Sequence, residues 1–272
     1  MPETQQTAGE LFRAGNLNDA IAAANAEVRR KPGDLGGRVL LAELLVFAGN
    51  LERADTILDV ASQADPSAAI VAAEFRQLLR ADLARRQFAR VGRVPEFLGE
   101  PTAPLRAALA AQVALRGGDA GEAAARAAEA EALRPRVPGS LKQEGGEIAF
   151  DDFRDVDDLC AGFFEVLTTN GKYYWVPTER VAAIQFHPPL RPRDLVWRRA
   201  TISVNRGLDG EVYIPAIYDS ADPDLPDNYR LGHGTDWTGG QAGPVRGIGQ
   251  RVFLAGDDAY PIMEIAKLSF SE

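Results

Sequence analysis

Thiol and imidazole side chains are scarce in this sequence. Its 272 residues include one cysteine, Cys160, and two histidines, His187 and His233. A single cysteine excludes an intrachain disulfide and a thiolate metal cage, and two histidines leave little material for acid–base or covalent catalysis. The carboxylates of residues 151–164 lack the spacing, the glycine and the terminal glutamate of an EF-hand calcium loop. We therefore expect no metal, no cofactor and no enzymatic activity.

Positive charge and long apolar runs are also in short supply. There are 30 Lys and Arg against 39 Asp and Glu, a formal net charge of -9 that repels polyanions, so nucleic acid is not an expected partner. The longest apolar run, residues 39–48, is interrupted by Glu43 and is too short to cross a bilayer. The first residues, MPETQQ, lack the basic flank and apolar stretch of a secretory signal. We expect a cytoplasmic protein with no membrane partner.

The residues that are abundant divide the chain in two. Alanine, leucine and arginine dominate roughly the first half, whereas the tryptophans and most strand-favouring runs come later. The join contains Pro135, Pro138 and Gly139, which stop a helix and extend the backbone. We predict an α+β protein with a helical-repeat domain over 1–139 and a smaller, strand-rich, barrel-like domain over 140–272. Each is expected to fold on its own.

The helical half repeats itself. The letters AGNL occur at 14–17 and again at 48–51, and Pro32 and Pro66 keep the same offset. A period of about 34 residues is that of the tetratricopeptide repeat, whose unit is a hairpin of two helices. A further copy, GDAGEA, begins at Gly118. The repeat pattern predicts an array of helical hairpins.

A degenerate unit must lie between the second and the last copy. Its helix is predicted over about residues 67–90, with a new start after Pro101 or Pro104. Gly15 and Gly49 supply the left-handed residue that ends the first helix of each hairpin. The alternative is a generic alanine-rich helical bundle with chance similarity between its segments.

Two β-hairpins are predicted in the second half. Strand-favouring runs at 163–167 and 172–176 flank an Asn-Gly pair, which is a strong short-range hairpin signal. A second hairpin is predicted from the runs at 200–205 and 211–215, joined by a turn that contains two glycines.

A helix is predicted over 151–164, because its acidic start suits a helix N-terminus. Cys160 would lie on the buried side of this helix, where a thiol without a nearby cation is inert.

The first helices of tetratricopeptide hairpins line a concave groove that suits a peptide or helix. In the repeat register, the residues expected to face this groove are Phe12, Arg13, Glu43, Phe47 and Arg80. Glu43 is expected to be exposed. Phe12 and Phe47 could instead belong to the core.

A second candidate surface is the segment RPRDLVWRR, which concentrates arginine and tryptophan in an otherwise acidic chain. These residue types are enriched where protein partners dock. The candidate residues are Arg191, Arg193, Trp197, Arg198 and Arg199. The alternative is internal pairing of the arginines with the many aspartates.

The competing hypothesis is an enzyme that uses His233 with Asp236. His233 lies between two glycines close to Asp236 and Trp237, but it has no identifiable catalytic partner in the sequence. The glycine-rich run at 243–250 has no lysine followed by Ser or Thr, so it is not a phosphate loop.

Several motifs of the second half resemble one known family. They are LTTNGKYYWVP at 167–177, RPRDLVWRRA at 191–200, GEVYIP at 210–215, TDW at 235–237 and PVRGIGQR at 244–251. On these motifs the chain resembles the ImpE family, also called TagJ, with a resemblance that extends over both halves.

The resemblance implies an accessory protein of a bacterial type VI secretion system. Such a protein would be an adaptor that binds a helix of the small contractile-sheath subunit and associates with the AAA+ ATPase that disassembles contracted sheaths. The family provides no catalytic residues to carry over. The resemblance leaves open which half holds the helix and whether the chain forms oligomers.

Overall fold

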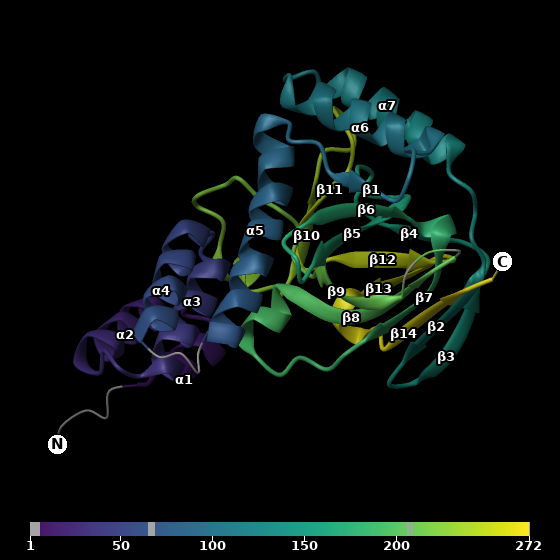
Figure 1. The fold of residues 1–272 in the computed structure, drawn as a ribbon. Helices are drawn as coiled ribbons and strands as arrows, with labels where there is room; N and C mark the ends of the chain where they lie inside the picture. Colours follow the sequence, from purple (N-terminus) through teal and green to yellow (C-terminus); the bar gives the residue numbers. More distant parts are fainter. Residues whose placement is uncertain (1–5, 65–68, 206, 208, 272) are drawn as a thin grey trace.

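The structure is a computed structural model that describes residues 6–64, 69–205, 207 and 209–271. Helices make up most of the N-terminal half and strands most of the C-terminal half, which confirms the predicted α+β class (Figure 1). The helices are α1 (Ala8–Arg13), α2 (Leu17–Arg30), α3 (Leu35–Phe47), α4 (Leu51–Ala64), α5 (Ala69–Val91), α6 (Ala103–Arg116), α7 (Ala120–Leu133) and the short α8 (Asp227–Arg230).

Three helical hairpins form where the repeat pattern predicts them. They are α1–α2, α3–α4 and α6–α7, and their turns contain Gly15, Gly49 and Gly118 with φ angles of 85°, 74° and 84°. A residue with a side chain is disfavoured in this left-handed region, which explains the glycine at each turn. Pro66, the landmark at the end of the second repeat, lies outside the described residues.

The degenerate unit between the hairpins is the single long helix α5, followed by a break and the start of α6. The predicted helix over about 67–90 is therefore confirmed, and α6 begins directly after Thr102, with Pro104 in its first turn. α5 is the longest helix at 23 residues. Among the described residues, no helix combines the length and apolar composition that crossing a membrane requires.

A sheet of nine strands has the order β1-β6-β5-β9-β8-β7-β14-β2-β3. Eight of its strands come from the C-terminal half, and β1 comes from the segment between α5 and α6. Among the described residues, its strands pair antiparallel except for β1, which pairs in parallel. A three-stranded sheet, β13-β12-β4, and a two-stranded sheet, β10-β11, accompany it. The strands are β1 (Glu96–Phe97), β2 (Gly139–Gln143), β3 (Gly146–Phe150), β4 (Phe153–Asp155), β5 (Phe163–Thr168), β6 (Tyr173–Pro177), β7 (Val181–Phe186), β8 (Trp197–Val204), β9 (Gly210–Pro215), β10 (Thr235–Thr238), β11 (Arg246–Gly249), β12 (Val252–Ala255), β13 (Asp258–Pro261) and β14 (Lys267–Phe270). Three 3-10 helices join them: η2 (Thr178–Arg180), η3 (Pro192–Leu195) and η4 (Ile262–Glu264).

Both predicted β-hairpins are confirmed. In the β5–β6 hairpin Leu167 pairs with Tyr173, and Gly171 in the turn has a φ of 83°. β8 and β9 form the second hairpin. Residues 206 and 208 of its predicted turn lie outside the described residues.

The helix predicted over 151–164 is wrong. The segment forms β4, a turn and the start of β5. The Asp155 carboxylate accepts the backbone N–H of Asp157 at 2.9 Å, and the Asp157 carboxylate accepts that of Leu159 at 2.8 Å. Side chains that bond the backbone two residues ahead stabilise turns in competition with a helix. Cys160 is buried as expected, although in a turn, and burial raises the pKa of its thiol.

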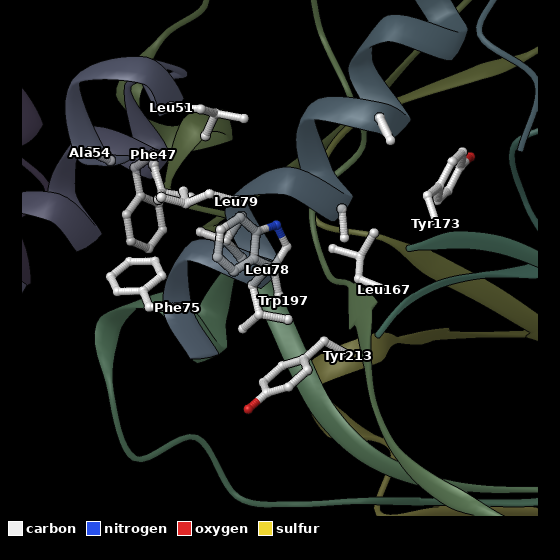
Figure 2. Packing of buried hydrophobic residues seen from close by; sticks show 14 of the residues in the cluster. Phe47, Leu51, Ala54, Phe75, Leu78, Leu79, Leu167, Tyr173, Trp197 and Tyr213 are labelled. Atoms are coloured by element: carbon white, nitrogen blue, oxygen red, sulfur yellow. The ribbon is translucent and has the colours of Figure 1, made fainter. Parts of the chain in front are cut away.

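One apolar cluster joins the two halves of the chain. In Figure 2, Phe75, Leu78 and Leu79 of α5 lie between side chains of α3 and α4 on one side and Trp197 and Leu167 of the sheet on the other. The opposite face of the nine-stranded sheet forms a second cluster with β4 and β12. Successive side chains of β5 point to opposite faces of the sheet, so Leu167 packs in the first cluster and Val166 in the second.

The predicted boundary at Gly139 coincides with the first residue of β2. A Cβ atom at this position would lie 2.2 Å from the Ser269 carbonyl oxygen of β14, so glycine permits two strands to approach closely here. We propose that the boundary separates two units that fold together, because the apolar cluster spans it.

A fragment of residues 1–139 should therefore be helical but unstable. Phe75 packs edge-on against Trp197 at 6.2 Å between ring centroids and Phe88 against Trp175 at 4.9 Å, and both contacts are lost in the fragment. Exposing a large apolar side chain costs about 1.5–3 kcal/mol. Circular dichroism with binding of a hydrophobic dye tests this. A fragment that binds no dye and melts at the temperature of the full chain would contradict it.

Candidate partner-binding surfaces

The two surfaces that the sequence nominates meet inside the molecule. Glu43 of α3 lies 3.4 Å from the guanidinium of Arg193 in η3, and both are buried, with exposed fractions of 4% and 2%. The Arg193 guanidinium also stacks on the Phe75 ring at 4.5 Å. Burial raises the pKa of Glu43 to about 7 against the opposing effect of Arg193. The expected exposure of Glu43 is therefore wrong, because η3 covers this face of α3.

The aromatic residues of the predicted groove belong to the core. Phe47 is buried, and its ring lies 5.1 Å from that of the half-buried Phe12, which favours the core alternative. Arg13 and Arg80 are exposed. Their contact with a partner stays a prediction.

The arginine-rich segment is also largely internal. Trp197 and Arg198 are buried, and Arg198 donates a hydrogen bond to the Ile262 carbonyl. The half-exposed Arg199 forms an ion pair with Glu211. Internal pairing, the alternative reading, thus holds for Arg193 and Arg199, but with glutamates. The buried Arg193, Trp197 and Arg198 cannot contact a partner without rearrangement. The half-exposed Arg199 and the exposed Arg191 stay candidates.

A buried network of charges connects α5 to the sheet. Arg85 of α5 donates to both carboxylate oxygens of Glu165 at 2.9 and 3.0 Å, and Arg251 donates to Glu165 from the other side. Tyr173 adds a hydrogen bond of 2.5 Å to the same carboxylate. Burial alone would raise the pKa of Glu165, but the two guanidiniums lower it to about 2. Glu165 is therefore ionised at neutral pH and holds the halves together.

This network could be recognised in the sequence only through one of its members. The available signal was Glu165 itself, an acidic residue between apolar residues in a strand whose faces are both covered. Such a residue needs a cationic partner. Nothing local identifies that partner, since Arg85 lies 80 residues away.

An open pocket of about 300 Å³ lies between the end of α3, α5 and the segment after β9. Its arginines are already engaged. Arg86 bonds Asp82 at 2.8 Å, Arg90 lies 3.5 Å from Asp219, and Arg230 donates to the Pro223 carbonyl. The pocket therefore offers few unsatisfied groups to a ligand.

A larger groove of about 800 Å³ lies over the first two hairpins, between α2 and the starts of α1 and α3. Its walls are made mainly of small side chains, and Glu27, Arg30 and Asp34 add charge. Helix axes approach closely where the facing residues are small, so this groove can accept another helix. Its small residues are Ala8, Gly9, Ala23, Ala24, Ala26, Gly36 and Gly37. The unused sequence signal was the run of alanines in α2 opposite a Gly-Gly pair.

Among the described residues, His233 and Asp236 of the enzyme hypothesis form no hydrogen bond or ion pair with each other. His233 is exposed, and Asp236 accepts a hydrogen bond from Tyr229 at 3.3 Å and one from the backbone of Trp237. His187 lies 3.0 Å from the Thr201 hydroxyl, a structural contact. Within residues 6–64, 69–205, 207 and 209–271, no three His, Cys, Asp or Glu side chains are grouped to hold a metal.

The chain is similar in sequence and in fold to known proteins. The family model described as ImpE protein matches residues 147–269. The chain is 32% identical over 267 residues to a Pseudomonas aeruginosa protein named type VI secretion system accessory component TagJ, covering 97% of this chain and 90% of that protein. The crystal structure of protein VPA1032 from Vibrio parahaemolyticus superposes with a TM-score of 0.87 at 25% identity and 97% coverage of both chains. The chain therefore belongs to the ImpE/TagJ family.

Proposed function

We propose that this protein is a non-catalytic accessory component of a bacterial type VI secretion system. It would act in the cytoplasm as an adaptor that binds a helix of the small sheath subunit and assists its engagement by the AAA+ disassembly ATPase. The observation that carries this proposal is the 32% identity to the accessory component TagJ over 97% of the chain. Similarity that extends through both halves supports a shared role for the whole protein.

We propose the groove of α1, α2 and α3 as the site for the sheath-subunit helix. Its volume of about 800 Å³ and its small side chains fit an amphipathic helix laid between two existing helices. Leu40 contributes an apolar contact. Glu27 and Arg30 pair with each other at the surface, and they would exchange this pair for charges on the incoming helix. This location differs from the groove predicted through Glu43 and Phe47, because η3 and the sheet occupy that face.

The adaptor acts through effective concentration. A protein that holds the sheath subunit at one surface and contacts the ATPase at another makes the second encounter intramolecular. Effective concentrations in the millimolar range are typical of short connections. No catalytic residue is required for this mechanism, which fits a family that provides none.

The test is calorimetric titration of the full chain with overlapping synthetic peptides that cover the helices of the small sheath subunit. Ala26 is exposed and lines the groove, so Ala26→Glu should introduce bulk and charge there without disturbing the core. We expect one peptide to bind wild type and to lose at least about tenfold in affinity, or about 1.4 kcal/mol, in the variant.

The matched control is Ala128→Glu, an exposed alanine in the middle of α7. It should bind the peptide like wild type. Equal affinities for wild type and Ala26→Glu would remove the helix from this groove, and no binding by any peptide would contradict the adaptor proposal itself.

A further inference from the structure

Positive charge gathers at one place on this acidic chain. Residues 83–95 and helix α6 together contain six arginines and no acidic residue, whereas the whole chain has a formal net charge of -9. Four of these arginines are exposed, namely Arg90, Arg93, Arg106 and Arg116. A local field opposite in sign to that of the whole molecule favours an acidic partner.

Exposed valines accompany these arginines. Val91 is 74% exposed, Val94 is 66% exposed and Val113 is 55% exposed. Val91 ends α5, Val94 follows it by three residues, and Val113 lies in the last turn of α6. Valines this exposed gain stability only when a partner covers them.

The end of α5 and the end of α6 form one continuous surface. The Arg116 guanidinium donates to the Phe88 carbonyl at 3.2 Å, and a Cβ atom on Gly92 would lie 2.9 Å from Arg116 Nη2. Figure 1 shows the same approach, with the upper end of α5 beside α6. Val113 is one turn before Arg116 and shares its side of the helix. We name this surface the α5–α6 patch: Arg90, Val91, Arg93, Val94, Val113 and Arg116.

Two of the three arginines of the patch, Arg93 and Arg116, retain unused pairing capacity. Arg90 lies 3.5 Å from Asp219, and Arg93 donates to the side-chain oxygen of Gln87 at 3.0 Å. In the part of the chain that the structure describes, Arg93 and Arg116 have no carboxylate within 4.0 Å. The nearby Glu96 lies 3.9 Å from Lys172, in the turn before β6. Carboxylates from outside can therefore pair with at least two guanidiniums.

We propose that the α5–α6 patch docks an acidic amphipathic helix of a partner protein. The valines would cover the apolar stripe of that helix, and the arginines would pair with glutamates and aspartates beside the stripe. The overall charge of -9 disfavours nucleic acid and anionic membranes, which need a larger basic surface. The patch is formed by α5 and α6, while the groove is formed by α1, α2 and α3, so both can be occupied at once.

The probe is a synthetic helical peptide of about 18 residues with leucines on one face and glutamates on both sides of it. Fluorescence anisotropy should show saturable binding to the full-length protein that weakens as salt is added. The double variant Arg93→Glu/Val94→Asp should bind at least about tenfold more weakly. Its melting temperature should stay that of wild type, because both side chains are exposed.

Matched controls make the result specific. The variant Arg29→Glu/Val60→Asp changes an exposed arginine and an exposed valine on α2 and α4, away from the patch, and should bind like wild type. A shuffled peptide of the same composition and a peptide with lysine in place of glutamate should bind at least about tenfold more weakly.

Three results would overturn the proposal: no saturable binding of the acidic peptide, equal binding of the shuffled or lysine peptide, or unchanged affinity in the patch variant. Binding of phosphatidylglycerol vesicles that competes with the peptide and is lost in the patch variant would assign the patch to a membrane instead. Loss of peptide binding in Ala26→Glu would place the probe in the groove, so failure here is separable from failure of the proposed function.

Discussion

Replacing Glu165 with alanine is expected to lower the free energy of unfolding by about 3 to 5 kcal/mol, because the change leaves buried guanidiniums without their shared carboxylate. Arg251 is fully buried and Arg85 nearly so, and both donate to Glu165. Urea denaturation at neutral pH measures the effect. The matched control is Glu211→Ala, which removes the half-exposed partner of Arg199 and should cost at most about 1 kcal/mol.

The same carboxylate gives this prediction a pH dependence. The pKa of Glu165 is about 2 in the folded protein, below its ordinary value of 4.5. Glu165 therefore contributes its full stabilisation above the pKa of the unfolded state, 4.5, and this stabilisation is lost as the pH falls from about 4.5 toward 2. The difference in stability between wild type and Glu165→Ala should shrink over this window. A loss below about 1 kcal/mol at neutral pH would mean that the network does not hold the two halves together.

The second large effect is expected from Glu43→Gln, which should raise the free energy of unfolding at alkaline pH, whereas Glu165→Ala lowers it. Burial holds the pKa of Glu43 at about 7, above its ordinary 4.5, although Arg193 and Arg191 oppose the shift. As the pH rises from about 4.5 to 7, the unfolded chain ionises here while the folded chain keeps its proton, so the folded state loses stability. Over this window the loss approaches about 3 kcal/mol.

Glutamine retains the shape of the protonated side chain and does not ionise. The variant should equal wild type near pH 4 and exceed it in stability at pH 8, as followed by thermal and urea unfolding at a series of pH values. Asp157, whose pKa burial also raises to about 7, is present in both proteins and cancels in the difference. A variant that is less stable than wild type at pH 8 would show that the ion pair with Arg193 outweighs the burial of Glu43.

Features encoded over short distances could be predicted from the sequence. The hairpin turns at Gly15, Gly49 and Gly118 follow from short sequence motifs that recur along the helical half. The β5–β6 turn follows from an Asn-Gly pair. The helix expected over 151–164 failed because Asp155 and Asp157 within it form turns with the backbone two residues ahead.

The candidate site could be predicted only in part, because its contacts are distant in sequence. Glu43 and Arg193 are 150 residues apart. The repeat pattern of the helical half, which placed Glu43 in a groove, contains no information about η3. Family membership, by contrast, was visible in motifs such as KYYWVP and RPRDLVW, which the comparison with TagJ confirms. The motif tryptophans, Trp175 and Trp197, are fully buried, so these motifs report on shared packing more directly than on a binding surface.

We expect helix α5 to carry force between the first two hairpins and the sheet. Its 23 residues extend about 35 Å, with Phe75 wedged between α3 and the sheet near one end and Phe88 against the sheet aromatics near the other. A helix that is packed against its neighbours near both ends keeps those neighbours at a fixed distance. A pull on a segment bound by the first hairpins would therefore reach the sheet through the side-chain contacts near the two ends of α5. The protein would then transmit tension between its first hairpins and its sheet with little extension. The separation of partners bound at these two places would stay on the order of the length of this helix.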